Sequence, residues 1–185
     1  MRKFAGVVMA LSLALTLSAC APDDGTPAPT SKSTPTPDQK LVPPVADETI
    51  TDVDPAPYDD GFGWIGFKVG SGPTWCTITS ETDRVLCEQN EAAAMYEPIP
   101  APEGCDGSYG YQVQLWANQP EAGQIAEFAC ASGQFNDPTA MQILPSGSKI
   151  TSGSISCYVK DVTVRCDNIN GQWIALGPKT WSLNN

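Results

Sequence analysis

The residue types most able to do chemistry in this chain are its cysteines and carboxylates, because histidine is absent. The chain has seven cysteines and no histidine. Without histidine, neither a Ser-His-Asp nor a Cys-His catalytic group can form, and histidine metal ligands are excluded. No two cysteines form a Cys-x-x-Cys pair, the spacing typical of zinc ligands and redox centres. The cysteines therefore indicate a structural role rather than metal binding or thiol catalysis.

Carboxylates remain as candidates, because a pair of acids flanking a glycosidic bond can cleave it. The acids considered are Asp59, Asp60, Glu88, Asp106 and Asp167. The sequence alone places no two of them across a cleft, and most surface acids only keep a protein soluble. Residues 167–171 have part of a calcium-loop pattern, but the second oxygen is misplaced and the twelfth position holds no Glu. We expect no catalytic residue, no metal and no cofactor.

The first twenty residues have the three parts of a signal peptide. Arg2 and Lys3 are basic, residues 4–17 are uncharged and apolar, and small residues lead to Cys20. The apolar run is too short to span a hydrocarbon core of about 30 Å. Residues 17–20, Leu-Ser-Ala-Cys, resemble the lipobox of bacterial lipoproteins, which implies that residues 1–19 are removed and Cys20 carries lipid. The alternative is an ordinary secretory signal with a stray cysteine.

Six cysteines remain once Cys20 is assigned to lipid, and an even number suits disulfides. They are Cys76, Cys87, Cys105, Cys130, Cys157 and Cys166. The compartment outside the membrane is oxidising, so three disulfides are expected. The first two are separated by ten residues and the last two by eight, and such even spacings in a hairpin place both partners directly opposite. We predict Cys76–Cys87 and Cys157–Cys166, which leaves Cys105–Cys130, among fifteen possible pairings.

Residues 20–60 have the composition of a disordered tether. Residues 21–60 contain nine of the 17 prolines, and nine acids against two lysines. Apolar residues are too few to offset the entropy of ordering. The remaining residues, 61–185, carry twelve acids and six bases without a basic cluster. This excludes ordinary nucleic-acid binding and a polybasic lipid patch, so we expect membrane contact through the lipid on Cys20.

Residues 61–185 show the short, punctuated periodicity of β-strands. The strand-like segments are 62–69, 111–116, 125–130, 154–159, 162–166 and 172–176, besides the hairpins predicted at the two cysteine pairs. Only residues 91–97 look helical. The segments 76–88 and 157–167 are weak copies of one another. The pattern predicts an all-β domain, a small antiparallel barrel or sandwich stabilised by three disulfides.

Five tryptophans are a large number for a domain of this size. They are Trp64, Trp75, Trp116, Trp173 and Trp181. We expect each of them to fill core space beside a disulfide. As an alternative, one or two could line an exposed groove for a sugar or a peptide, where an aromatic face gives a large contact area.

Several short motifs follow one another in residues 67–183: Phe67 before Ser71 and Cys76, Val85-Leu-Cys-Glu88, Cys105 before Tyr109-Gly110, Gly123 before Phe128-Ala-Cys-Ala131, Ile143-Leu-Pro-Ser-Gly147 before Cys157, and Val164-Arg-Cys166. In this order they resemble a family of small actinobacterial cell-envelope proteins. The chain departs from the family at residues 70–75, where the family usually reads Ser-Pro-Ser-Gly-Asn-Ile, and at Tyr109, where the family usually has Trp. The family has no assigned function, so the resemblance implies a disulfide-bonded β-domain and no reaction.

Together these patterns predict a non-enzymatic lipoprotein, held by lipid on the extracytoplasmic face of the cell membrane. Its domain would act as a binding or accessory module for an envelope protein or cell-wall component. A carboxylate-dependent hydrolase of cell-wall glycans is the alternative, and a secreted inhibitor or structural protein is a third possibility. A deep pocket with converging carboxylates would favour the enzyme, whereas a flat or shallow patch would favour the binding module.

Overall fold

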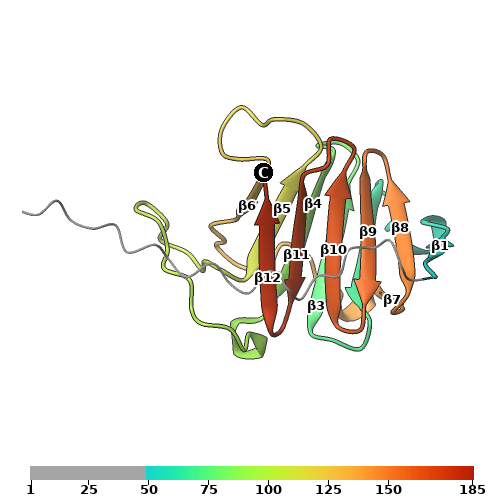
Figure 1. The fold of residues 1–185 in the computed structure, drawn as a ribbon, viewed down its shortest axis with the longest axis horizontal. Coiled ribbons are helices and arrows are strands. Elements are labelled where there is room, and N and C mark those ends of the chain that lie inside the picture. Colours follow the sequence, from blue (N-terminus) through green and yellow to red (C-terminus); the bar gives the residue numbers. More distant parts are fainter. Residues whose placement is uncertain (1–48) are drawn as a thin grey trace, which may run out of the picture. The chain divides into compact units, whose positions relative to one another are not determined.

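The computed structural model describes residues 49–185, which form a sandwich of two six-stranded sheets. Sheet A consists, in spatial order, of β1 (Thr51–Val53), β8 (Ser148–Ser152), β9 (Ile155–Lys160), β10 (Thr163–Asn168), β11 (Trp173–Gly177) and β12 (Thr180–Asn184). Sheet B consists of β6 (Ala126–Phe128), β5 (Gln112–Trp116), β4 (Arg84–Gln89), β3 (Thr74–Thr79), β2 (Trp64–Val69) and β7 (Gln142–Leu144). Figure 1 shows β8 to β12 in front of the strands of sheet B. The all-β prediction is confirmed, as a sandwich rather than a closed barrel.

The two halves of the domain have the same strand topology. Each half supplies five consecutive strands, paired antiparallel, to one sheet: β2 to β6 in sheet B and β8 to β12 in sheet A. The first strand of each half crosses to the other sheet, where β1 pairs in parallel with β8, and β7 with β2. The weak sequence copies seen around the cysteine pairs therefore belong to a duplication of all six strands.

The three disulfides have the pairing predicted from their spacing. Cys76 and Cys87 lie opposite each other in the β3–β4 hairpin, and Cys157 and Cys166 do so in the β9–β10 hairpin, with Cα atoms 4.1 and 4.0 Å apart. The third bridge joins Cys105 to Cys130. The sulfurs of Cys87 and Cys166 are 3.9 Å apart, so the two hairpin bridges meet between the sheets at equivalent places in the two halves.

The alternation of side chains along the strands fills the core from both sheets. Phe67, Leu115 and Ile150 are fully buried there, among other aliphatic residues. Because the hairpin cysteines point inward, the residue after each cysteine points outward. Glu88 on β4 and Asp167 on β10 therefore lie on the outer faces of two different sheets.

The folded domain starts earlier than the predicted boundary between residues 60 and 61. Thr51–Val53 form β1, and the 3-10 turn η3 (Ala56–Tyr58) places Tyr58 against the core. The Tyr58 hydroxyl donates to the carbonyl of Ile143, 3.2 Å away. Composition misses this segment because a three-residue edge strand needs few apolar residues. Cys20 and residues up to 48 lie outside the described residues.

Some short elements also differ from the prediction. The helix-like segment 91–97 contains only the 3-10 turn η4 (Glu91–Ala93), because Pro98 follows and no apolar face has formed. Strands β7, β8 and β12 were not predicted, since their sequences lack a continuous apolar alternation. Another 3-10 turn, η5 (Pro138–Ala140), precedes β7.

Residues 129–141, here called the strap, cross the outer face of sheet B. They must do so because β6 and β7 lie at opposite edges of that sheet, about 24 Å apart at ~4.8 Å per strand. Phe135 of the strap stacks on Trp64, and Met141 lies above Gly66, where it would contact any added Cβ. The strap therefore buries outward side chains that an open sheet would expose.

Candidate functional site

The acids considered as a catalytic pair do not face one another across a cleft in residues 49–185. Glu88 and Asp167 project from opposite outer faces of the sandwich. Asp59 accepts the N–H of Gly61 at 2.7 Å, and Asp60 accepts turn N–H groups two and four residues further on. Asp106 is exposed in the long connection between β4 and β5. These acids therefore have structural or solvated positions.

Glu88 fastens the strap to sheet B. Its side chain is 1% exposed. One carboxylate oxygen accepts from Gln112 Nε2 at 2.7 Å and from the Phe135 N–H at 2.8 Å; the other accepts from Trp75 Nε1 at 3.0 Å and the Asn136 N–H at 3.3 Å. Burial raises the pKa of Glu88, while the bonds from Phe135, Trp75 and Asn136 oppose that shift. Beneath the strap it has no access to a substrate.

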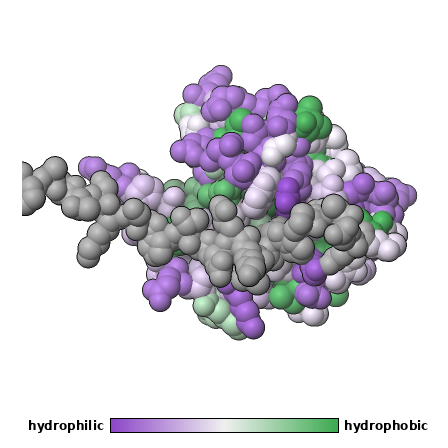
Figure 2. Space-filling view, in the orientation of Figure 1, coloured by the Kyte–Doolittle hydropathy of each residue, from purple (hydrophilic) through white to green (hydrophobic). Residues whose placement is uncertain are grey.

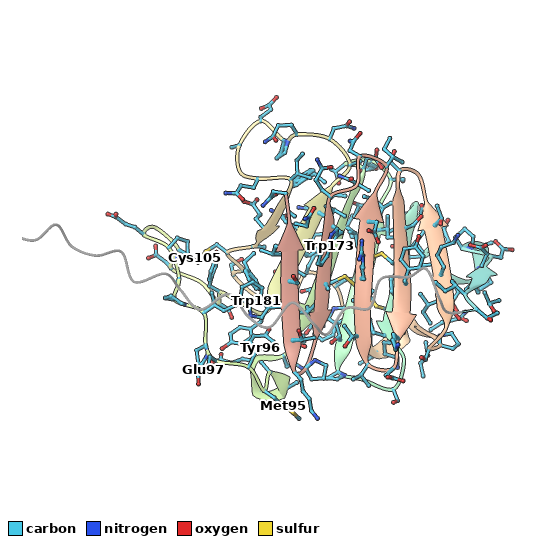
Figure 3. The ribbon with its side chains drawn as sticks, viewed as in Figure 1. Met95, Tyr96, Glu97, Cys105, Trp173 and Trp181 are labelled. Carbon is cyan, nitrogen blue, oxygen red and sulfur yellow. A yellow bond between two sulfur atoms is a disulfide. The ribbon has the colours of Figure 1, made fainter. Side chains whose placement is uncertain are left out.

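Asp167 holds the equivalent position in the other half but has a different partner. Arg165 Nε donates to both its carboxylate oxygens at 3.0 Å, forming a bidentate ion pair. The Arg165 guanidinium also lies over the ring of Trp173, 4.4 Å from its centroid. This group lies on the outer face of sheet A, where Figure 3 shows Trp173 on the side nearer the viewer.

An arginine and three aromatic rings form a continuous row on the outer face of sheet B. Trp64 and Phe135 stack with their centroids 5.5 Å apart. The Arg84 guanidinium lies 5.4 Å from the Phe135 centroid and 4.9 Å from that of Trp116. Burial lowers the pKa of Arg84, which as an arginine nevertheless remains charged at neutral pH. The order Trp64, Phe135, Arg84, Trp116 defines what we call the arginine–aromatic row.

A shallow hollow of about 490 Å³ opens at the Trp116 end of this row. It is lined by Thr82, Trp116, Asn118, Gln119, Pro120, Glu121 and Ala122, from the β3–β4 turn and the connection between β5 and β6. We call it the Trp116 hollow. This end of the domain, at the top of Figure 2, is mainly hydrophilic. An indole bordered by amide and carboxylate groups offers both a stacking surface and hydrogen bonds.

Two buried N–H groups of the arginine–aromatic row have no hydrogen-bond acceptor among the described residues. They are Nε1 of Trp116 and Nε of Arg84. A buried donor without an acceptor costs about 1–3 kcal/mol. Both atoms are enclosed by protein, so the surface that Trp116 offers to a ligand in the hollow is its ring face rather than its N–H.

The backbone beneath the hollow is held by the neighbouring turns. Asn168 Nδ2 donates to the Trp116 carbonyl and Asn170 Nδ2 to the Ala117 carbonyl, both at 2.9 Å. The Ala117 N–H donates to the carbonyl of Asp83 at 2.9 Å. The segment that looked like part of a calcium loop therefore uses its asparagines to position Trp116.

A second hollow, of about 410 Å³, lies at the other end of the sandwich. Its lining consists of Gly70, Ser71, Ile143, Pro145, Ser146, Asp161 and Val162. It has no aromatic residue and no amide side chain, so it offers fewer specific contacts than the Trp116 hollow.

The prediction that all five tryptophans fill the core is wrong. Trp64, Trp116 and Trp173 are only partly buried and point outward, and Trp75 is buried under the strap rather than in the core. Only Trp181 packs against the core, edge-on to Phe128 with centroids 4.8 Å apart. The alternative of a groove-lining tryptophan fits Trp116. Arg84 and Phe135 were not predicted, although Arg84 is one of only six bases after residue 60.

The described residues contain one close sulfur cluster that could suggest a metal. The sulfurs of Cys76, Cys87 and Cys166 lie within 4.8 Å of one another, but all three belong to disulfides and offer no thiolate. Within residues 49–185, no helix has the length and apolar character needed to cross a membrane. Comparisons with protein-family models, curated proteins and solved structures gave no match.

Proposed function

We propose that the chain is a non-enzymatic envelope lipoprotein, anchored by lipid on Cys20, whose sandwich binds a component outside the membrane. The Trp116 hollow and the adjoining arginine–aromatic row form the binding site. The observation that carries the proposal is the partly exposed Trp116 ring, bordered by the amide side chains of Asn118 and Gln119. Its best-fitting ligand is a sugar ring of a wall glycan, which stacks on aromatic faces and accepts hydrogen bonds through its oxygens.

Three further features support an extracytoplasmic binding role. The three disulfides are typical of proteins that fold in an oxidising compartment. The hollow is shallow, and its rim carries one carboxylate, Glu121, rather than an opposed pair. Its backbone is held by turns of both sheets, so a ligand would meet a formed surface and little ordering entropy would oppose binding.

The rival proposal, a carboxylate hydrolase of wall glycans, has less support. Inverting and retaining glycosidases both need two acids that face the scissile bond at a fixed separation. Glu88 is buried under the strap and Asp167 is paired with Arg165 on the other sheet. A binding role for a protein partner through the same hollow remains part of the proposal and is an outcome of the test below.

The test is co-sedimentation of the purified protein with isolated cell-wall material. Trp116→Ala should weaken binding about tenfold, because a stacked aromatic contributes about 1.4 kcal/mol or more. Trp173→Ala is the matched control, since it removes an outward, partly buried tryptophan that also stacks on an arginine. An equal loss of binding in the Trp116→Ala and Trp173→Ala variants would show that the Trp116 hollow is not the binding site. Binding only to a protein extracted from the wall would show that the ligand is a protein rather than a glycan.

A further inference from the structure

Phe62, in the loop between η3 and β2, is the most exposed large apolar side chain of residues 49–185, at 83%. Single apolar residues on a protein surface are ordinary, so exposure alone is weak evidence of a function. The distinguishing feature of Phe62 is the loop that carries it, residues 59–63, here called the Phe62 loop. Side chains on both sides of the tip hold the backbone of this loop.

Two aspartates fix the backbone of the Phe62 loop. Asp59 Oδ1 accepts the Gly61 N–H at 2.7 Å. Asp60 Oδ1 accepts the N–H groups of Phe62 and Trp64 at 2.8 and 3.2 Å, and the Asp60 N–H donates to the Trp64 carbonyl at 3.1 Å. Aspartate side chains that accept an N–H two residues further on are typical of ordered turns. The amide of Phe62 is therefore paired within its own loop.

A glycine on either side of Phe62 lets the chain turn so that the aromatic ring points into solvent. Gly61 and Gly63 have φ of +86° and +84°, a conformation that residues with a Cβ rarely adopt. The Gly63 carbonyl accepts from Ser80 Oγ at 2.8 Å, which ties the loop to the β3–β4 turn. Because this backbone is already held, the loop has little conformational entropy to lose when a partner binds. Aromatic residues are enriched at protein interfaces, and a preformed aromatic tip is suited to anchor one.

The end of the sandwich that carries the Phe62 loop is acidic. Its loops and turns are linked by hydrogen bonds and comprise residues 59–63, 80–83, 117–125, 153–154 and 169–172. Together they contain no Lys or Arg and five acids, which are Asp59, Asp60, Glu81, Asp83 and Glu121. Asp59 and Asp60 belong to the Phe62 loop, Glu81 follows the serine that binds it, and all three are exposed. Phe62 is therefore surrounded by negative charge.

This charge distinguishes between the possible partners of Phe62. An anionic lipid surface would be repelled, since binding to such surfaces uses Lys and Arg. A second copy of the chain would place acids against acids: Glu121 lines the Trp116 hollow, Asp161 lines the second hollow, and neither lining contains a base. A different protein, with an apolar pocket rimmed by Lys or Arg, would complement both the ring and the charge.

We infer that the Phe62 loop is a docking site for such a protein, distinct from the glycan site proposed at the Trp116 hollow. The Phe62 ring enters the apolar pocket of the partner, and Asp59, Asp60 and Glu81 face the basic residues around that pocket. Burial of the ring supplies the affinity, and the carboxylates speed association at low salt. The site does not depend on glycan binding, because it uses a different loop.

The first experiment is photocrosslinking in native cells of the full-length chain with benzoylphenylalanine at Glu81, a position that leaves Phe62 intact. We expect one extracytoplasmic protein to be crosslinked, and the crosslink to disappear when Phe62→Ala is added. Ile169→Ala is the matched control, because Ile169 is a large apolar residue of the same end, is 74% exposed and should leave the crosslink unchanged. Both side chains are exposed, so neither variant should unfold the domain.

The crosslinked protein, once purified, is the probe for a binding measurement. Phe62→Ala should weaken the Kd about tenfold or more, and Ile169→Ala should leave it unchanged. A triple variant, Asp59→Asn, Asp60→Asn and Glu81→Gln, keeps an acceptor oxygen at each position and removes three charges. It should lower the association rate about tenfold in about 50 mM salt and have little effect in about 500 mM salt, where exposed charges are screened.

Three results would overturn the inference. The first is crosslinking only to lipid or to a second copy, or to no protein at all. The second is a Kd that Phe62→Ala leaves unchanged, or that Ile169→Ala weakens equally. The third is an association rate that the triple variant leaves unchanged at low salt, which would contradict a basic rim around the partner's pocket.

Discussion

Glu88→Gln should loosen the strap and destabilise the domain by between about 2 and 3 kcal/mol. The two oxygens of Glu88 accept two donors each, but glutamine has a single acceptor oxygen. Two donors thus lose a charge-assisted bond worth about 1.5 kcal/mol each, and relief of the buried charge offsets part of that loss. The longer bonds, from Trp75 and the Asn136 N–H, are the pair expected to break.

Urea unfolding measures the loss, and amide hydrogen exchange at Phe135 and Asn136 shows where it occurs. With a slope of about 1.5 kcal/mol per molar urea, the midpoint should fall by between about 1 and 2 M. Asp167→Asn is the matched control at the equivalent position, where a partly exposed ion pair should contribute about 1 kcal/mol or less. An unchanged midpoint with unchanged protection at both amides would refute the role of Glu88 as the anchor of the strap.

Three further predictions concern pH, cross-linking and the anchor. Burial raises the pKa of Tyr96 from 10.0 to about 12, so the folded state holds this proton more tightly and stability should fall as pH rises through that window. Tyr96→Phe should cost about 1–2 kcal/mol at neutral pH by removing the bond donated to the Gly110 carbonyl and the bond accepted from Gln89 Nε2, yet flatten the decline in unfolding free energy between pH 10 and 12. Replacing Cys105 and Cys130 by serine opens a loop of 25 residues and should lower the unfolding free energy by about 3.5 kcal/mol, measured in urea; a loss below 1 kcal/mol would contradict the entropic reasoning. Cys20→Ser should move the protein from the membrane fraction to the soluble fraction and abolish labelling with a clickable fatty acid, whereas a retained lipid would contradict the anchor.

The parts of the fold that follow from local geometry could be predicted from the sequence. Even spacing of Cys76 and Cys87, and of Cys157 and Cys166, is enough to place each pair opposite in a hairpin. The third bridge, Cys105–Cys130, followed by elimination. The alternation of apolar and polar residues predicts the central strands, because the side chains of a strand with one buried face repeat every two residues.

The rest of the fold depends on contacts distant in sequence. Strands β1 and β7 have three residues each. Each is a strand only because it pairs with a strand of the other half, β1 with β8 and β7 with β2. The tryptophans were placed in the core because large rings usually bury there. Trp75, however, points outward from sheet B and is still buried, because the strap covers it. Its indole N–H donates to Glu88. The arginine–aromatic row likewise combines β2, β4, β5 and the strap, and no spacing along the chain reveals it.

The most direct test of the binding proposal is the indole N–H spectrum of the nitrogen-15-labelled protein during titration with soluble wall-glycan fragments. The five tryptophans give five signals, one of which belongs to the unpaired N–H of Trp116. The proposal predicts that this signal shifts together with the amides of residues 118–122, while that of Trp173 stays in place. A Trp116 signal that does not move at saturating glycan, or shifts confined to the face that carries Trp173, would contradict it.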